Sequence, residues 1–187
     1  MTFFFRHLFP VAALCAVLSF PLSAVRAADS APKTDGSGWI LPDLSSGSKT
    51  TDWSWYLRLN DARAEAVKDN KPILIVFSGP DWSSRSKSFE SSILKSKEFA
   101  SLVRPAVVGL YIQHFVKTTA PEEQVEANQS LRKALAVPQV YPCTVVLASD
   151  GKTILGIIQG VPGTTVRVDK MAYLRQVAQL IGVKIPE

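Results

Sequence analysis

A nearly continuous apolar run, PILIVF at residues 72–77, constrains the fold more than any other stretch of the chain. A strand with one solvated face alternates apolar and polar residues, whereas a strand buried on both faces is apolar throughout. The Asp69-Asn70 pair before the run is a turn signal that stops a preceding helix. The run therefore predicts a central strand with helices on both sides of its sheet, an α/β arrangement.

Helical and strand patterns alternate around this run, as judged from the spacing and length of the apolar segments. Four helices are expected. The first covers residues 55–68, and the second follows Trp82 and breaks at Ser96 before a short further turn. The third begins at Pro121, and the last covers residues 169–181 and ends at Gly182. The expected strands are 72–77, 106–112, 144–148 and 153–158, and the Asp-Gly pair of SDGK predicts a hairpin between the last two. Two parallel strands followed by an antiparallel hairpin make a central mixed four-stranded sheet with helices on both faces.

Two helix starts carry their own local signals. Ser96 is expected to cap the short turn, and Pro121 is expected at the first position of the third helix. In that third helix, helical spacing predicts that Val125, Leu131 and Leu135 face inward.

Residues 1–27 have the pattern of a secretory signal peptide. Arg6 gives a basic start, an interrupted apolar run follows, and small residues precede a cleavage site after Ala27. Cys15 lies in that run after Leu14, which does not suit a lipoprotein signal, so no stable membrane anchor is expected after cleavage. The protein is predicted to be secreted or periplasmic.

After cleavage, residues 28–51 are rich in Ser, Gly, Pro, Lys and Thr and are predicted to form a flexible linker. Trp39 interrupts it, and whether that segment docks on the domain is left open. Residues 52–187 are predicted to form one domain. The formal charge of +5 loses two arginines with the signal peptide, and no dense Lys/Arg block remains, so nucleic acid is not an expected partner.

Two separated motifs point to a family. In ILIVFSGPDWSSRS the central strand runs into Trp82, Ser83 and Ser86, and VPQVYPCTVVLASDGK carries Pro142 at the start of the hairpin. Together with the element order, these motifs resemble the thioredoxin-like superfamily over residues 52–182. The resemblance implies that Trp82 matches the tryptophan of a Trp-Cys-x-x-Cys loop, that Ser83 and Ser86 stand where its cysteines would be, and that Pro142 is a cis-proline.

The serines change what such a loop can do. A dithiol works because one cysteine is a thiolate that attacks a disulfide and the other resolves the mixed disulfide. A hydroxyl is far less acidic and does neither, so Ser83 and Ser86 exclude dithiol exchange here. The matching position of a buried acid in the family is Val76, and no proton acceptor is expected beneath the loop. We expect the serines to cap the following helix.

Serine hydrolysis has little support in the sequence. A nucleophilic serine needs a general base, and the only histidine after the signal peptide is His114, which is expected to be an ordinary polar residue at a sheet edge. No Gly-x-Ser-x-Gly elbow is present.

Cys143 is the only cysteine left after the signal peptide, so no internal disulfide can form. It follows Pro142 and is expected to be a small buried residue, with a reactive thiol as the alternative. One cysteine and one histidine do not make a structural metal site, and neither a metal nor a cofactor is expected.

These observations favour an exported thioredoxin-fold protein without a redox dithiol. Its predicted binding surface comprises Trp82, Ser83, Tyr141 and Pro142, and its expected ligand is an extended polypeptide or partner protein, in a binding or chaperone-like role. The alternative is a thiol–disulfide oxidoreductase or isomerase that acts through Cys143. Whether the protein is an enzyme stays open, with the serines weighing against it.

Overall fold

A computed structural model describes residues 39–40, 55–163 and 167–185. All of them belong to one unit, Pro32–Glu187. The predicted signal peptide, its cleavage site and most of the predicted linker lie outside the described residues. Within those residues, none of the helices combines the length and the apolar character needed to cross a membrane.

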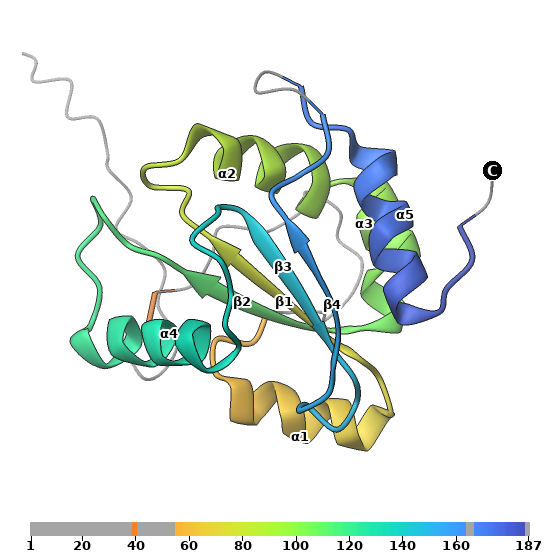
Figure 1. Cartoon of the computed structure of the whole chain (residues 1–187), viewed down its shortest axis with the longest axis horizontal. Helices are drawn as coiled ribbons and strands as arrows, with labels where there is room; N and C mark the ends of the chain where they lie inside the picture. The colour runs from red at the N-terminus through yellow and green to blue at the C-terminus, as the bar shows by residue number, and fades with distance from the viewer. Residues whose placement is uncertain (1–38, 41–54, 164–166, 186–187) are drawn as a thin grey trace, which may run out of the picture. The chain divides into compact units, whose positions relative to one another are not determined.

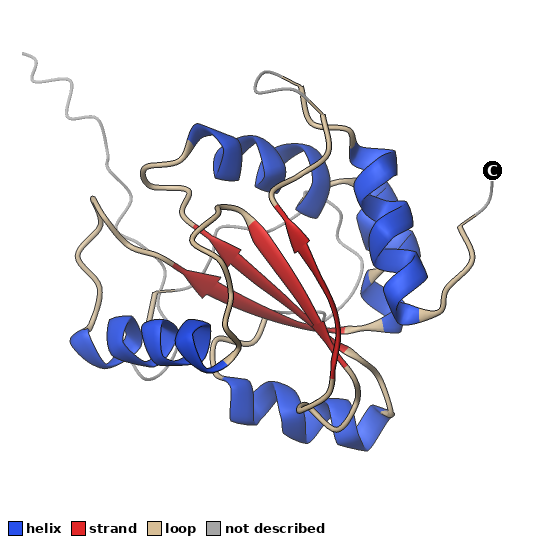
Figure 2. Ribbon diagram, in the orientation of Figure 1, coloured by secondary structure: helices blue, strands red, loops and turns tan. Residues whose placement is uncertain are grey.

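The sheet has four strands in the order β2-β1-β3-β4 (Figures 1 and 2). Strand β1 (Ile73–Ser78) pairs in parallel with β2 (Val108–Gln113) and antiparallel with β3 (Cys143–Leu147), which in turn pairs antiparallel with β4 (Ile154–Gln159). Every residue of β1 is buried, as its apolar sequence requires for a strand covered on both sides. The predicted mixed four-stranded sheet is confirmed.

Helices cover both faces of this sheet (Figure 1). The helical elements are α1 (Leu59–Asp69), α2 (Ser84–Phe89) continuing into the π-helical turn η1 (Glu90–Leu94), α3 (Lys97–Leu102), the 3-10 turn η2 (Arg104–Ala106), α4 (Glu122–Ala134) and α5 (Lys170–Ile181). Side chains alternate across β1, so Ile73, Ile75 and Phe77 join the core with α1 and α4. Leu74 and Val76 join the opposite core with α2, η1, α3 and α5.

The first helix begins at Leu59, four residues later than predicted. The reason is that Tyr56 forms a parallel bridge with Leu110 at the outer edge of β2. Its amide donates to the Gly109 carbonyl, and its carbonyl accepts from the Tyr111 amide, both at 2.9 Å. Trp55 packs against Phe99 and Tyr111 instead of along a helix.

The other helix starts follow local chemistry. The Ser96 hydroxyl accepts from the Phe99 amide at 3.2 Å, which confirms the predicted cap of α3. Pro121 immediately precedes α4 instead of occupying its first turn. Gly182 closes α5 in the left-handed region, at φ 71°, as expected for a helix C-terminus.

The inner face of α4 is partly apolar and partly polar. Leu131 and Leu135 pack against the core, as predicted, but they and Val125 are only half-buried, whereas the buried residues of α4 are the polar Gln124 and Asn128. The Asn128 amide donates to the Gln113 carbonyl at 2.9 Å and thereby satisfies the end of β2. Buried amides need such partners, and apolar periodicity does not reveal them.

Gln124 is buried because its side chain forms two hydrogen bonds with the backbone of Ile40 in the N-terminal segment. The Ile40 amide donates to Gln124 Oε1 at 2.9 Å, and Gln124 Nε2 donates to the Ile40 carbonyl at 3.2 Å. The neighbouring Trp39 is only 4% exposed, and the Arg58 guanidinium lies 4.0 Å from the centre of its ring. This part of the predicted linker therefore docks on the domain.

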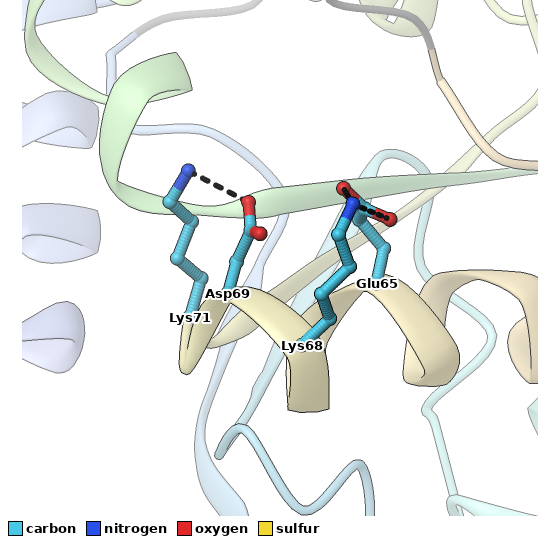
Figure 3. A network of polar contacts seen from close by, with 4 residues as sticks. All are labelled: Glu65, Lys68, Asp69 and Lys71. Atoms are coloured by element: carbon cyan, nitrogen blue, oxygen red, sulfur yellow. Dashed lines mark hydrogen bonds and ion pairs between the residues drawn. The ribbon is translucent and has the colours of Figure 1, made fainter.

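Two exposed ion pairs lie at the carboxyl end of α1. Lys68 pairs with Glu65 at 3.2 Å and Lys71 pairs with Asp69 at 3.1 Å (Figure 3). Exposed pairs of this kind add little to stability, because solvent screens them. Asn70, in the left-handed region at φ 49°, ends the helix, as the sequence predicts.

Replacing Gln124 by Ala is expected to release the docked segment, because both hydrogen bonds to Ile40 are lost. Trp39 should become exposed, with a red shift in tryptophan emission and faster proteolysis before residue 55. Gln129→Ala, an exposed position on the same helix, is the control. Equal emission and proteolysis in the two variants would contradict this role of Gln124.

Candidate functional site

The candidate site lies at the carboxyl end of β1 and β2, where the start of β3 also arrives. Because β1 and β2 are parallel, the loops after Ser78 and Gln113 leave the sheet at the same edge. They bring Trp82 and His114 beside Tyr141, which precedes β3. The centre of the Trp82 ring lies 5.3 Å from the centre of the Tyr141 ring and 5.9 Å from that of His114. The His114 and Tyr141 rings stack, with their centres 5.2 Å apart. We call Trp82, His114 and Tyr141 the aromatic surface; Pro142, which was predicted to belong to the binding surface, is buried behind it.

Trp82 folds back over the end of β1. Its indole nitrogen donates to the His114 carbonyl at 3.0 Å, and 38% of the residue remains exposed. Gly79 makes this possible, because a Cβ at that position would lie 2.4 Å from the indole nitrogen. Trp82 is therefore held in place while part of its apolar ring remains accessible.

Asp81 joins the Trp82 loop to the loop that follows β2. Its Oδ2 accepts from the amides of Val116, Lys117 and Thr118, at 2.8, 2.8 and 3.1 Å. Burial alone would raise the pKa of this carboxyl, but the three amides favour the charged form and hold the pKa below its ordinary value.

The hydroxyls of Ser83 and Ser86 both accept hydrogen bonds from backbone amides of the loop. Ser83 Oγ accepts from the Ser86 amide at 3.2 Å as the N-cap of α2, and the fully buried Ser86 Oγ accepts from the Gly79 amide at 3.3 Å. Within the described residues, no His, Asp or Glu side chain bonds to either hydroxyl. This arrangement agrees with helix capping and offers no activated serine nucleophile.

A carboxylate does lie beneath the loop, contrary to the prediction of no proton acceptor there. Glu90, at the start of η1, is 9% exposed, and its Oε1 accepts from Ser78 Oγ and from the Tyr111 hydroxyl, each at 2.6 Å. Burial, and then the negative charge of Glu90, raise the pKa of Tyr111 well above its ordinary value. The prediction failed because it considered the strand position Val76, whereas the acid comes from the following helix.

Tyr141 presents both a ring and a backbone to this surface. The Tyr141–Pro142 peptide bond is cis, and neither the amide nor the carbonyl of Tyr141 has a hydrogen-bond partner among the described residues. Burial raises the pKa of the Tyr141 phenol, opposed by Arg132, whose guanidinium lies 4.4 Å from the ring centre. An extended ligand could pair with this free backbone.

His114 and Arg132 are the residues of the site that the sequence interpretation missed. His114 belongs to the aromatic surface instead of an ordinary sheet edge, and Arg132 fixes Tyr141 from α4 while donating to the Pro138 carbonyl. Both also line a cavity of about 20 Å³, large enough for about one water molecule. The parallel pairing of β1 and β2 was the signal that could have placed His114 beside Trp82.

Cys143 does not belong to the site. It is fully buried in the core shared with α1 and α4, whereas α2 packs on the opposite face of the sheet. Burial raises the pKa of its thiol, with a smaller opposing effect of Arg132. In the part of the chain that the structure describes, no cluster of three or more His, Cys, Asp or Glu side chains could hold a metal ion.

Comparison with known proteins agrees with this architecture. The model of the family described as Thioredoxin-like matches residues 54–149, more than half of the chain. The chain belongs to the Thioredoxin-like family. The match contains β1, the Trp82 loop, β2 and the Tyr141–Pro142 turn, so the family assignment rests on the elements that build the site.

Two curated relatives of this thioredoxin-like protein come from Chlamydia pneumoniae. One is "Disulfide bond reductase DsbH", 26% identical over 75% of this chain and 78% of its own length. The other is "Thioredoxin-related protein DsbJ", 24% identical over 63% of this chain, and only 34% of its length is spanned. The solved structure "DsbH Oxidoreductase", at 24% identity and a TM-score of 0.58, covers 75% of this chain and 95% of its own. The structural likeness confirms the fold.

Asp81→Asn is expected to lower the free energy of unfolding by about 1 kcal/mol at neutral pH, because a neutral amide is a weaker acceptor for three backbone donors. Since the folded pKa of Asp81 is depressed, its contribution is complete above the unfolded pKa of about 4 and is lost as pH falls through the folded value.

Chemical denaturation of both proteins between pH 7 and pH 2 measures this effect. The difference between the wild type and Asp81→Asn should be constant above about pH 5 and should shrink below that. The control is Glu126→Gln, on the exposed face of α4. A difference that does not change with pH would contradict the assignment.

Proposed function

We propose that this thioredoxin-like protein binds extended polypeptide at the aromatic surface and performs no dithiol chemistry. The ligand would be a segment of a partner protein or an unfolded chain. Its side chains would contact the Trp82 ring, and its backbone would pair with Tyr141. Backbone pairing supplies affinity that does not depend on one sequence, which suits a binding or chaperone-like role.

The unpaired backbone of Tyr141 carries this proposal. An amide and a carbonyl without partners among the described residues lie next to an apolar ring that is 38% exposed. Polar backbone groups are normally bonded to protein or water, so a strand-like ligand can replace solvent there at small cost. Tyr141 itself is held by Trp82, His114 and Arg132, which reduces the entropy lost on binding.

Export and disulfide-related partners fit the same role. The signal-peptide pattern of residues 1–27 supports a secreted or periplasmic location, with cleavage after Ala27. A curated relative is named as a disulfide bond reductase, which supports a role near proteins that form or lose disulfides. With serines at positions 83 and 86, this chain would hold such partners without exchanging their disulfides.

Thiol chemistry through Cys143 is the competing function. The relative's name favours it, but a reactive thiol needs exposure and a depressed pKa, and Cys143 is fully buried with its pKa raised. We therefore prefer non-covalent binding.

Trp82→Ala is expected to weaken polypeptide binding about tenfold or more, because a central tryptophan dominates the energy of such contacts. The probe is fluorescein-labelled, reduced and carboxymethylated α-lactalbumin, a permanently unfolded chain, and the measurement is its fluorescence anisotropy. Trp82→Phe should retain intermediate affinity, because it keeps a ring but loses the bond to the His114 carbonyl.

Val67→Ala is the control, since Val67 is an exposed apolar residue on α1, outside the aromatic surface. Affinity should be the same with and without reductant, because the chain of the probe carries no free thiol. Equal affinities for the wild type, Trp82→Ala and Val67→Ala would reject the aromatic surface as the binding site.

A further inference from the structure

Charged side chains are unevenly distributed around the aromatic surface. Three segments supply its residues: 79–86, 113–120 and 135–142. They contain two basic residues, Arg85 and Lys117, and a single acidic residue, Asp81. The charges that border the surface therefore decide which kind of ligand can approach it, because like charges repel and opposite charges attract at short range.

Asp81 does not present its charge to a ligand. Its Oδ2 accepts from the amides of Val116, Lys117 and Thr118, and its Oδ1 is buried. The carboxylate is thus directed at backbone amides of the neighbouring loop. A ligand that reaches the aromatic surface meets basic side chains and no accessible carboxylate from the three segments.

Arg132 adds a further positive charge from α4. It is half-buried, its guanidinium lies 4.4 Å from the centre of the Tyr141 ring, and it donates to the Pro138 carbonyl. Within the described residues, no carboxylate pairs with this guanidinium, and its Nη1 is a buried donor without a partner there. A partly buried charge without a counter-ion is unfavourable, so an anion brought close to Tyr141 would stabilise it.

Arg85 lies on the other side of the same surface. It is in the first turn of α2, three residues after Trp82, and its Nη2 donates to the Val161 carbonyl at 2.5 Å. A cation at a helix N-terminus is unfavourable for the helix, so this position is not explained by helix stability. Because α2 and α4 cover opposite faces of the sheet, Arg85 and Arg132 flank Tyr141 from both sides.

We propose that the polypeptide bound at the aromatic surface is acidic, and that Arg85 and Arg132 determine this preference. The inference rests on the proposed function and names the class of its ligand. Apolar side chains of the ligand contact the Trp82 ring, and Asp or Glu side chains beside them approach the two guanidiniums. The amide and carbonyl of Tyr141 favour polypeptide over other anions, because they pair with a backbone. Complementary charge accelerates association and disfavours basic chains.

Fluorescence anisotropy with three fluorescein-labelled peptides, on protein expressed from the full reading frame, tests the preference. The peptides are about 12 residues long, share the same leucine and phenylalanine residues, and differ only in having Glu, Gln or Lys between them. At about 50 mM NaCl we expect the Glu peptide to bind about tenfold more tightly than the Gln peptide, and the Lys peptide to bind most weakly. The difference should largely disappear at about 500 mM NaCl, because salt screens the charges.

The ratio of the dissociation constants for the Gln and Glu peptides separates charge from structure, because a damaged surface would weaken both peptides alike. Arg85→Gln and Arg132→Gln should each lower this ratio about threefold, whereas Arg132→Lys should retain it. Lys133→Gln is the control. It removes an exposed positive charge from the same helix as Arg132 and should leave the ratio unchanged.

Three results would overturn the acidic preference. They are equal affinity of the wild type for all three peptides, a ratio that survives both arginine-to-glutamine changes, and displacement of the Glu peptide by oligothymidylate at lower concentration than by the same peptide without label. The last result would indicate a site for nucleic acid. If Trp82→Ala still weakens every peptide, binding at the aromatic surface stands while the preference falls. If no peptide binds, or Trp82→Ala weakens none, both fall.

Discussion

The burial of β1 on both of its faces is the constraint on which the rest of the structure depends. Its side chains alternate between two cores, and each core takes its own set of helices. Because β1 is central and parallel to β2, their carboxyl ends leave the sheet together. The Trp82 loop, His114 and the turn before β3 therefore meet at one edge. The aromatic surface is a consequence of this topology.

The loop above β1 is held by polar contacts that do not involve a thiol. Asp81 ties it to the loop after β2, Ser83 and Ser86 bond its backbone, and Gly79 leaves room for the Trp82 ring. Beneath it, the buried carboxylate of Glu90 accepts two short hydrogen bonds, from Ser78 and Tyr111. A buried network of this kind stabilises one conformation only when its members are paired. These contacts order the loop, as the proposed binding of polypeptide requires.

Much of the fold could be predicted from the sequence, because its signals were local. The uniform apolar character of β1, the Asp-Gly turn before β4, and the caps at Ser96 and Gly182 all depend on neighbouring residues. The prediction failed where distant contacts decide. Residues 55–58 have a helical pattern, but Tyr56 bonds to the edge of β2. Gln124 and Asn128 are buried because they bond to Ile40 and Gln113. Glu90 was missed because a polar residue on a short amphipathic helix is usually exposed.

The reactivity of Cys143 tests most directly whether the site works without thiol chemistry. The folded protein would be mixed with a thiol reagent from neutral to alkaline pH, with Cys143→Ser as control. Because the thiol is buried and its pKa raised, we expect no stoichiometric reaction until denaturant unfolds the chain. Rapid reaction of the folded protein at neutral pH would contradict this account and would support an enzyme that uses Cys143.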